Sequence, residues 1–143
     1  MSVVRDFGEY VKKGVVKKQT VDVLRSDSLR RESENGYDSL MKYVERLGID
    51  DKNSNMIIKM AYDVIMELIR ARMLLDGFNS SGYGAHEAEV SYLRKLGFIE
   101  ADVEFVDRLR YFRNGIIYYG KVFDKEYIEK VLGFLKKVRK IFG

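Results

Sequence analysis

The chain has 143 residues and a formal net charge of +4, with 46% hydrophobic and 34% charged residues. This balance is typical of one globular domain and excludes a disordered chain. There is no cysteine and only one histidine, His86, which excludes disulfides, thiolate chemistry and a histidine-rich metal site. We therefore expect no metal and no cofactor, and the small positive charge is only a mild bias toward polyanions.

The N-terminal segment carries charges at Arg5, Asp6 and Glu9, which leave no room for the apolar core of a signal peptide. No apolar run in the sequence approaches the length of a membrane span. These features predict a cytoplasmic protein without a membrane segment. Residues 1–34 are highly charged with sparse apolar positions, so we expect either an exposed helix or an N-terminal arm.

Two amphipathic helices are predicted next along the chain. The first runs through Tyr37 and Val44 and stops at Gly48. The second starts after the capping candidates Asn53 and Ser54 and carries a wide apolar face over about five turns. That face contains Met56, Ile57, Met60, Ala61, Val64, Ile65, Leu68, Ile69, Leu74 and Leu75. We expect this helix to lie at the centre of the fold.

A loop rich in glycine and serine, residues 78–84, precedes a short predicted helix from Ala85 to Leu96. His86 lies at the start of this helix. A histidine in that position is expected to cap or pack the helix more often than to act as a base. It is far from Arg113 in the sequence, although folding could bring the two together.

The last predicted helix follows Asp124, which can cap it, and carries apolar residues on one face and lysines on another. With the segments before it, this helix completes a predicted all-α bundle of four main helices plus shorter ones. The length of the chain indicates a single domain spanning residues 1–143.

Residues 99–123 could form either a helix or a strand, because their second half is also good strand material. We favour a helix, since a lone strand in an all-helical chain would have no partner. On a helix, the core side holds Phe105, Leu109, Phe112, Ile116 and Phe123. The opposite side holds Asp107, Arg110, Tyr111, Asn114, Tyr118 and Lys121.

This second side is polar and aromatic together, which is unusual for a solvated helix surface. In one interpretation the tyrosines pack on a neighbouring helix and the polar groups form a structural hydrogen-bond network. In the other, the side is a homodimer interface or an anion-binding groove, in which Arg110, Tyr111 and Lys121 contact RNA or a nucleotide.

The segment Arg113-Asn114-Gly-Ile-Ile-Tyr118 resembles the Arg-polar-x-x-x-His motif of HEPN domains, which are small all-α bundles. The order of helices from residue 17 to residue 143 resembles that family as well. The resemblance implies a homodimer in which the motifs of both chains face a shared cleft. It also implies one of three roles: a metal-independent RNase, a toxin of the toxin–antitoxin kind, or a partner of a small nucleotidyltransferase.

Carried over from the family, Arg113 would stabilise charge at the scissile phosphate, Asn114 would orient its neighbours and position 118 would supply acid–base chemistry. This chain has Tyr118 where the motif has histidine. A phenol with a pKa of about 10 is a poor base at neutral pH compared with an imidazole at about 6.5. We therefore favour a HEPN-like nucleic-acid or nucleotide-associated domain whose altered Arg-Tyr centre has weak or no RNase activity. Two alternatives stay open: an active metal-independent RNase that uses Arg113 and Tyr118, and an interaction module that binds a small nucleotidyltransferase.

Overall fold

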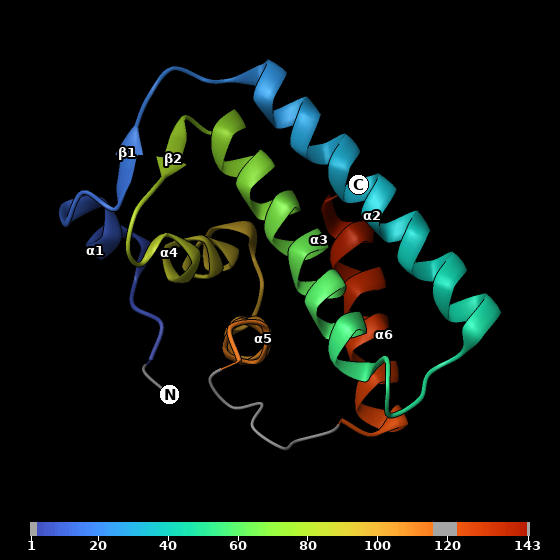
Figure 1. Ribbon diagram of the computed structural model, residues 1–143. Helices are drawn as coiled ribbons and strands as arrows, with labels where there is room; N and C mark the ends of the chain where they lie inside the picture. Colours follow the sequence, from blue (N-terminus) through green and yellow to red (C-terminus); the bar gives the residue numbers. More distant parts are fainter. Residues whose placement is uncertain (1–2, 116–122, 143) are drawn as a thin grey trace.

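The computed structural model describes residues 3–115 and 123–142 (Figure 1). Within them, four main helices form a bundle, which confirms the predicted all-α class. The elements in chain order are α1 (Phe7–Lys12), β1 (Val16–Lys18), α2 (Val23–Leu47), α3 (Ser54–Leu75), β2 (Phe78–Ser80), α4 (Ala85–Ser91), the 3₁₀ helix η1 (Tyr92–Leu96), α5 (Glu100–Arg113) and α6 (Lys125–Phe142). Residues 3–34, predicted as a charged helix or arm, include α1, β1 and the first half of α2.

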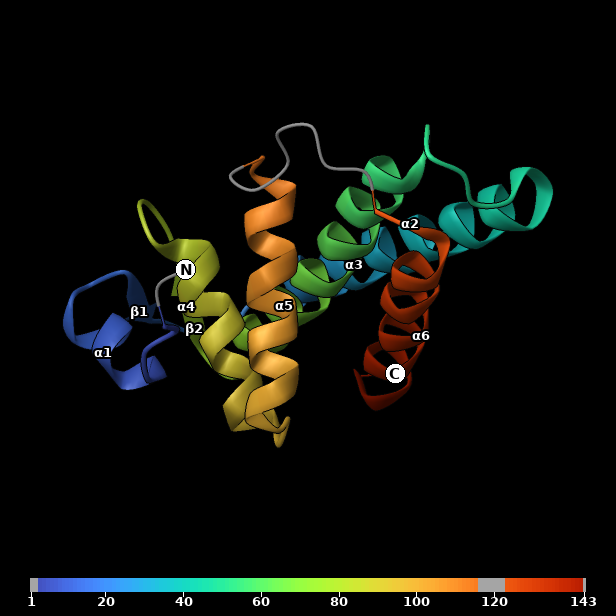
Figure 2. The ribbon, with the colours of Figure 1, turned by 90° about the horizontal axis from the view of Figure 1, so that it is seen from below.

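Helix α3 is the centre of the bundle, as its sequence predicts, and it contacts α2, α4, α5 and α6. Figure 2 shows α4 and α5 together on one side of α3 and α6 on the other. The fully buried side chains of α3 include Ile57, Ile65 and Ile69, whereas Met56, also predicted on the apolar face, is 37% exposed. Burial of a branched aliphatic side chain contributes about 1.5–3 kcal/mol, so this helix supplies much of the stabilising free energy of the core.

Small residues let α2 lie close against α3. The hydroxyls of Ser26 and Ser33 donate hydrogen bonds to backbone carbonyls of α3, at 2.7 Å to Ala71 and 3.0 Å to Val64. A Cβ added at Gly36 would lie 3.1 Å from Cγ2 of Val64. These contacts explain how a helix as polar as α2 stays packed on the core with few buried apolar residues.

A small antiparallel sheet joins the N-terminal segment to the bundle. β1 pairs with β2 so that Val16 lies opposite Ser80 and Lys18 lies opposite Phe78. These residues were predicted to lie in a charged segment and a loop, because strands of three residues are too short to show an alternating pattern. The sheet holds the loop that leads directly into α4.

Helix α5 is shorter than predicted, because it ends at Arg113 instead of continuing to Phe123. Gly115 follows with φ 75°, a left-handed conformation that suits glycine and stops the helix. Tyr118 and Lys121 lie outside the described residues. The predicted core side is confirmed on α5 at Phe105, Leu109 and Phe112, all buried, and Phe123 is buried beyond the end of this helix. Ile116, predicted on the same side, lies outside the described residues.

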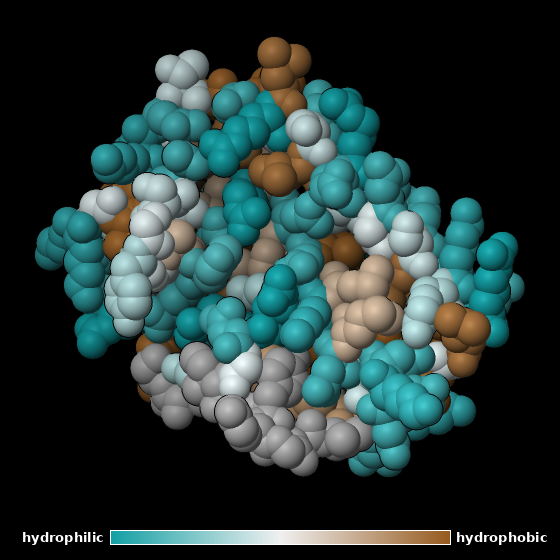
Figure 3. Space-filling view, viewed as in Figure 1, coloured by the Kyte–Doolittle hydropathy of each residue, from teal (hydrophilic) through white to brown (hydrophobic). Residues whose placement is uncertain are grey.

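The cap predicted for the last helix is confirmed, since Oδ1 of Asp124 accepts a hydrogen bond from the Tyr127 backbone N–H at 2.8 Å. Hydrophilic residues cover most of the face in Figure 3, and apolar residues appear as separate patches, one of them over the start of α2. In the described ranges, no helix combines the length and apolar character needed to cross a membrane.

Candidate functional site

A polar cleft of about 370 Å³ lies where α3 faces the start of α4 and the end of α5. We call it the α3–α5 cleft. Its described lining consists of Tyr62, Asp63, Met66, Glu67, Arg70, His86, Arg113 and Asn114. The structure therefore brings together Arg113 and Asn114, both predicted site residues, and adds His86 from a distant part of the sequence.

Helix α3 contributes to this cleft a polar stripe whose residues were not among the predicted site residues. Asp63, Glu67 and Arg70 are spaced at i, i+4 and i+7, so they lie on one side of the helix. The signal was present in the sequence, because three charged residues at helical spacing interrupt a segment that is otherwise mostly apolar. The apolar residues cover so wide a face of this helix that the three charged residues were not recognised as a separate stripe.

Arg113 reaches the cleft from the last turn of α5. Its Nε lies 3.2 Å from Oδ1 of Asp63, and the two side chains are 40% and 53% exposed. Ion pairs this exposed contribute about 0–1 kcal/mol, since water screens them. The guanidinium can therefore exchange Asp63 for an anionic ligand with little loss of stability.

Arg70 is held differently, by a buried carboxylate behind the cleft. Its Nε and Nη2 donate to the two oxygens of Glu89 at 2.8 and 3.0 Å. The Ser80 hydroxyl donates to the same carboxylate at 2.6 Å, and Nδ1 of His86 lies 3.2 Å from it. Burial alone would raise the pKa of Glu89, but the hydrogen bonds from His86, Arg70 and Ser80 outweigh it and hold the pKa below 4.5.

This carboxylate fixes the imidazole of His86. An ionised carboxylate only accepts hydrogen bonds, so Nδ1 of His86 is the donor and Nε2 remains for another partner. The side chain of His86 is 59% exposed, whereas that of Glu89 is 2% exposed. His86 therefore has one nitrogen anchored to the protein and the other available to a ligand.

Glu67 is a partly buried carboxylate in the same cleft. Desolvation by burial raises its pKa to about 7, and the negative charges of Glu32 and Asp63 add to the shift. Within the part of the chain that the structure describes, Glu67 has no hydrogen bond or ion pair. It is thus a carboxyl group that can take up and release a proton near neutral pH.

Tyr62 adds a buried phenol to the lining. Its side chain is 4% exposed, and its hydroxyl has no hydrogen-bond partner among the described residues. Burial raises the pKa of Tyr62 above its usual value, with a further contribution from Glu89. The group stays neutral and can donate a hydrogen bond.

Two predicted ligand-binding residues, Arg110 and Tyr111, are not in the described lining of the cleft. Nε of Arg110 lies 2.8 Å from Oδ1 of Asp107, and these side chains are only 14% and 5% exposed. The Arg110 guanidinium also lies 4.7 Å from the centre of the Tyr111 ring. Both residues therefore have contacts within the fold, and their binding of a ligand stays a prediction.

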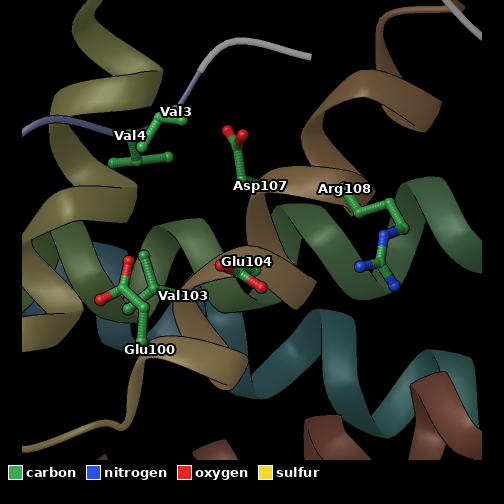
Figure 4. A pocket seen from close by; sticks show the side chains of 7 residues that line it. All are labelled: Val3, Val4, Glu100, Val103, Glu104, Asp107 and Arg108. Carbon is green, nitrogen blue, oxygen red and sulfur yellow. The ribbon is translucent and has the colours of Figure 1, made fainter.

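A second cavity, of about 160 Å³, lies between the N-terminal segment and α5 (Figure 4). Its lining includes Val3 and Val4 on one side and the carboxylates of Glu100, Glu104 and Asp107 on the other. The guanidinium of Arg108 extends away from these valines. This cavity has one arginine against three carboxylates, whereas the α3–α5 cleft has two arginines against the carboxylates of Asp63 and Glu67. The α3–α5 cleft is therefore the better anion site.

In residues 3–115 and 123–142, no group of three or more histidine, cysteine, aspartate or glutamate side chains is arranged to hold a metal ion. Comparison with protein-family models, with curated proteins and with solved structures finds no match to this chain.

Proposed function

We propose that this protein is a HEPN-like helical domain that binds the phosphate groups of RNA or of a nucleotide in the α3–α5 cleft. The observation that carries the proposal is that Arg113, Asn114 and His86 line one polar cleft. Arginine binds phosphate through a planar fork of donors, and asparagine and histidine provide further hydrogen bonds.

The dimensions and charges of the cleft support this proposal. Its volume of about 370 Å³ is in the range of small-ligand sites, about 300–1,000 Å³. Arg113 is half-exposed and weakly paired, so its charge is available. Arg70 is neutralised by Glu89, which leaves Arg113 as the principal phosphate contact among the described lining residues.

The resemblance to HEPN domains supports the same site. The motif residues Arg113 and Asn114 lie at the end of the third main helix of a bundle of four, where they face α3 and α4. The centre is altered relative to the family, because Tyr118 occupies the histidine position of the motif. With tyrosine in that position, the motif residues bind phosphate but catalyse weak or no cleavage.

The replacement Arg113→Ala is expected to weaken RNA binding about three- to tenfold and to change the midpoint of urea unfolding little. Loss of one phosphate contact removes one released counterion, so the salt dependence of binding should also become less steep. Fluorescence anisotropy of a labelled single-stranded RNA at several salt concentrations measures both effects.

Arg46→Ala is the matched control, since Arg46 is an exposed arginine on α2 outside the cleft lining. It removes the same charge and should leave RNA affinity within about twofold. Equal weakening by both replacements would show a non-specific charge effect. Equal loss of stability and of binding in Arg113→Ala would identify Arg113 as a structural ion-pair residue.

The resemblance also leads us to expect a homodimer whose two clefts face each other. Sedimentation equilibrium at micromolar concentration should give twice the mass of 16.7 kDa. A shared cleft would let two Arg113 side chains bind neighbouring phosphates of one RNA strand. A protein that stays monomeric at this concentration would contradict the shared cleft, while binding by a single cleft would still be testable by the Arg113 replacement.

A further inference from the structure

We infer that Glu67 and His86 act as general base and general acid in the cleavage of RNA at a phosphate bound by Arg113. The inference rests on the proposed function, because it requires RNA phosphate in the α3–α5 cleft. It differs from the role expected for Tyr118, since both proton-transferring groups come from α3 and α4, outside the motif.

The first basis is their placement. Glu67 lies on α3 and His86 at the start of α4, and both line the cleft that Arg113 and Asn114 enter from α5. A phosphate at Arg113 is therefore accessible to a carboxyl group and an imidazole in the same cleft. Cleavage of RNA without a metal needs this set of groups: a base, an acid and a cation.

The second basis is that each group is prepared for its role. Glu67 is partly buried and has no hydrogen bond or ion pair among the described residues, so nothing there holds its carboxylate away from a substrate hydroxyl. His86 is anchored through Nδ1 to Glu89, and Glu89 is in turn fixed by Arg70 and Ser80. With Nδ1 bound to this carboxylate, Nε2 is the ring atom that can give a proton to a leaving group.

The reaction is an internal transesterification. The Glu67 carboxylate takes the proton of the ribose 2′-hydroxyl, and the 2′-oxygen forms a bond to phosphorus. The bond from phosphorus to the 5′-oxygen breaks, and Nε2 of the His86 imidazolium gives its proton to that oxygen. The products are a 2′,3′-cyclic phosphate and a free 5′-hydroxyl, and no oxidant or co-reactant is required.

The charged groups around the pair set its pH dependence. Burial and the negative charges of Glu32 and Asp63 raise the pKa of Glu67 to about 7, and the positive charge of Arg70 opposes the shift. His86 faces Glu89, and the cleft also contains Arg113. Loss of the Glu67 proton should therefore make the cleavage rate rise as pH increases toward about 7, and this rise should be absent from Glu67→Gln.

The experiment uses the full chain in excess over a labelled single-stranded RNA of mixed sequence, with EDTA present. Binding is measured separately on the 2′-O-methyl form of the same RNA, which cannot be cut by this reaction. We expect wild-type protein to produce cyclic phosphate ends on the RNA and to leave DNA of the same sequence intact. Glu67→Gln and His86→Asn should each slow cleavage by bound protein about 10²- to 10⁴-fold, which is much more than either replacement weakens the binding of the 2′-O-methyl RNA.

Arg46→Ala, outside the cleft, should cut at the wild-type rate and controls for contaminating nuclease and for charge. Binding of the 2′-O-methyl RNA without any cleavage of RNA would overturn this inference and leave the proposed function standing. Cleavage by both cleft variants at the wild-type rate would also overturn it. Absence of any RNA binding would overturn the proposed function and this inference with it.

Discussion

The replacement Arg70→Met is expected to lower the free energy of unfolding by about 3–5 kcal/mol, because it leaves the buried carboxylate of Glu89 without its cation. The Glu89 side chain is only 2% exposed, and Arg70 contacts both of its oxygens at 2.8 and 3.0 Å. Methionine keeps most of the aliphatic volume, so the loss reflects charge more than packing. Urea unfolding followed by circular dichroism measures it.

Two further variants identify the cause of this loss. Arg72→Met removes an exposed partner of Asp76 on the same helix and should lower stability by less than about 1 kcal/mol. Combining Arg70→Met with Glu89→Gln removes the buried charge and should recover part of the lost stability. If Arg70→Met is no more destabilising than Arg72→Met, the buried Arg70–Glu89 pair contributes no more to stability than an exposed ion pair does.

The replacement Glu67→Gln is expected to stabilise the protein at about pH 8 by about 1–2 kcal/mol and to change little at about pH 4. The folded protein binds the Glu67 proton more tightly than the unfolded chain does, because its pKa is raised from 4.5 to about 7. The stability gained from this tighter proton binding is fully present below pH 4.5 and is lost as pH rises through about 7. The expected stabilisation is smaller than the full pKa shift would give, because Glu67 is partly exposed and water screens its charge.

Urea unfolding of the wild type and the variant at several pH values measures this difference. Glu45→Gln is the matched control, because Glu45 is exposed on α2, outside the cleft lining, and its replacement removes the same charge. A stability difference for Glu67→Gln that does not change between about pH 4 and pH 8 would contradict the raised pKa. It would also remove the support that this pKa gives to Glu67 as a base.

Helical periodicity alone predicted much of the fold. The apolar positions of α3 and the Asp124 cap of α6 appear where the sequence placed them, because both features depend on residues close together in the chain. The β1–β2 pairing depends on contacts between residues far apart in sequence, and its strands are too short to show a pattern. The end of α5 was predicted too late, because Gly115, inside the predicted helix, adopts a left-handed conformation.

The candidate site was predicted in part. Arg113 and Asn114 lie in the cleft. Arg110 and Tyr111, predicted to contact RNA or a nucleotide, are outside its described lining and have contacts within the fold, which also agree with the structural interpretation of that side. His86 was expected to cap or pack its helix, and its half-exposed imidazole lies against Glu89 one turn further along α4. That role could not be read from the sequence, since it depends on a buried carboxylate and on the packing of α4 against α3.

One measurement tests the central claim that RNA binds in the α3–α5 cleft. The chain has a single histidine, so the imidazole NMR signals of His86 report on the cleft without resonance assignment. We predict that adding the 2′-O-methyl RNA shifts these signals in proportion to bound RNA, and that Arg113→Ala reduces the shift at equal RNA concentration. RNA binding that leaves the His86 signals unchanged would contradict the claim and would place the RNA elsewhere, for example at the lysines near the end of α6.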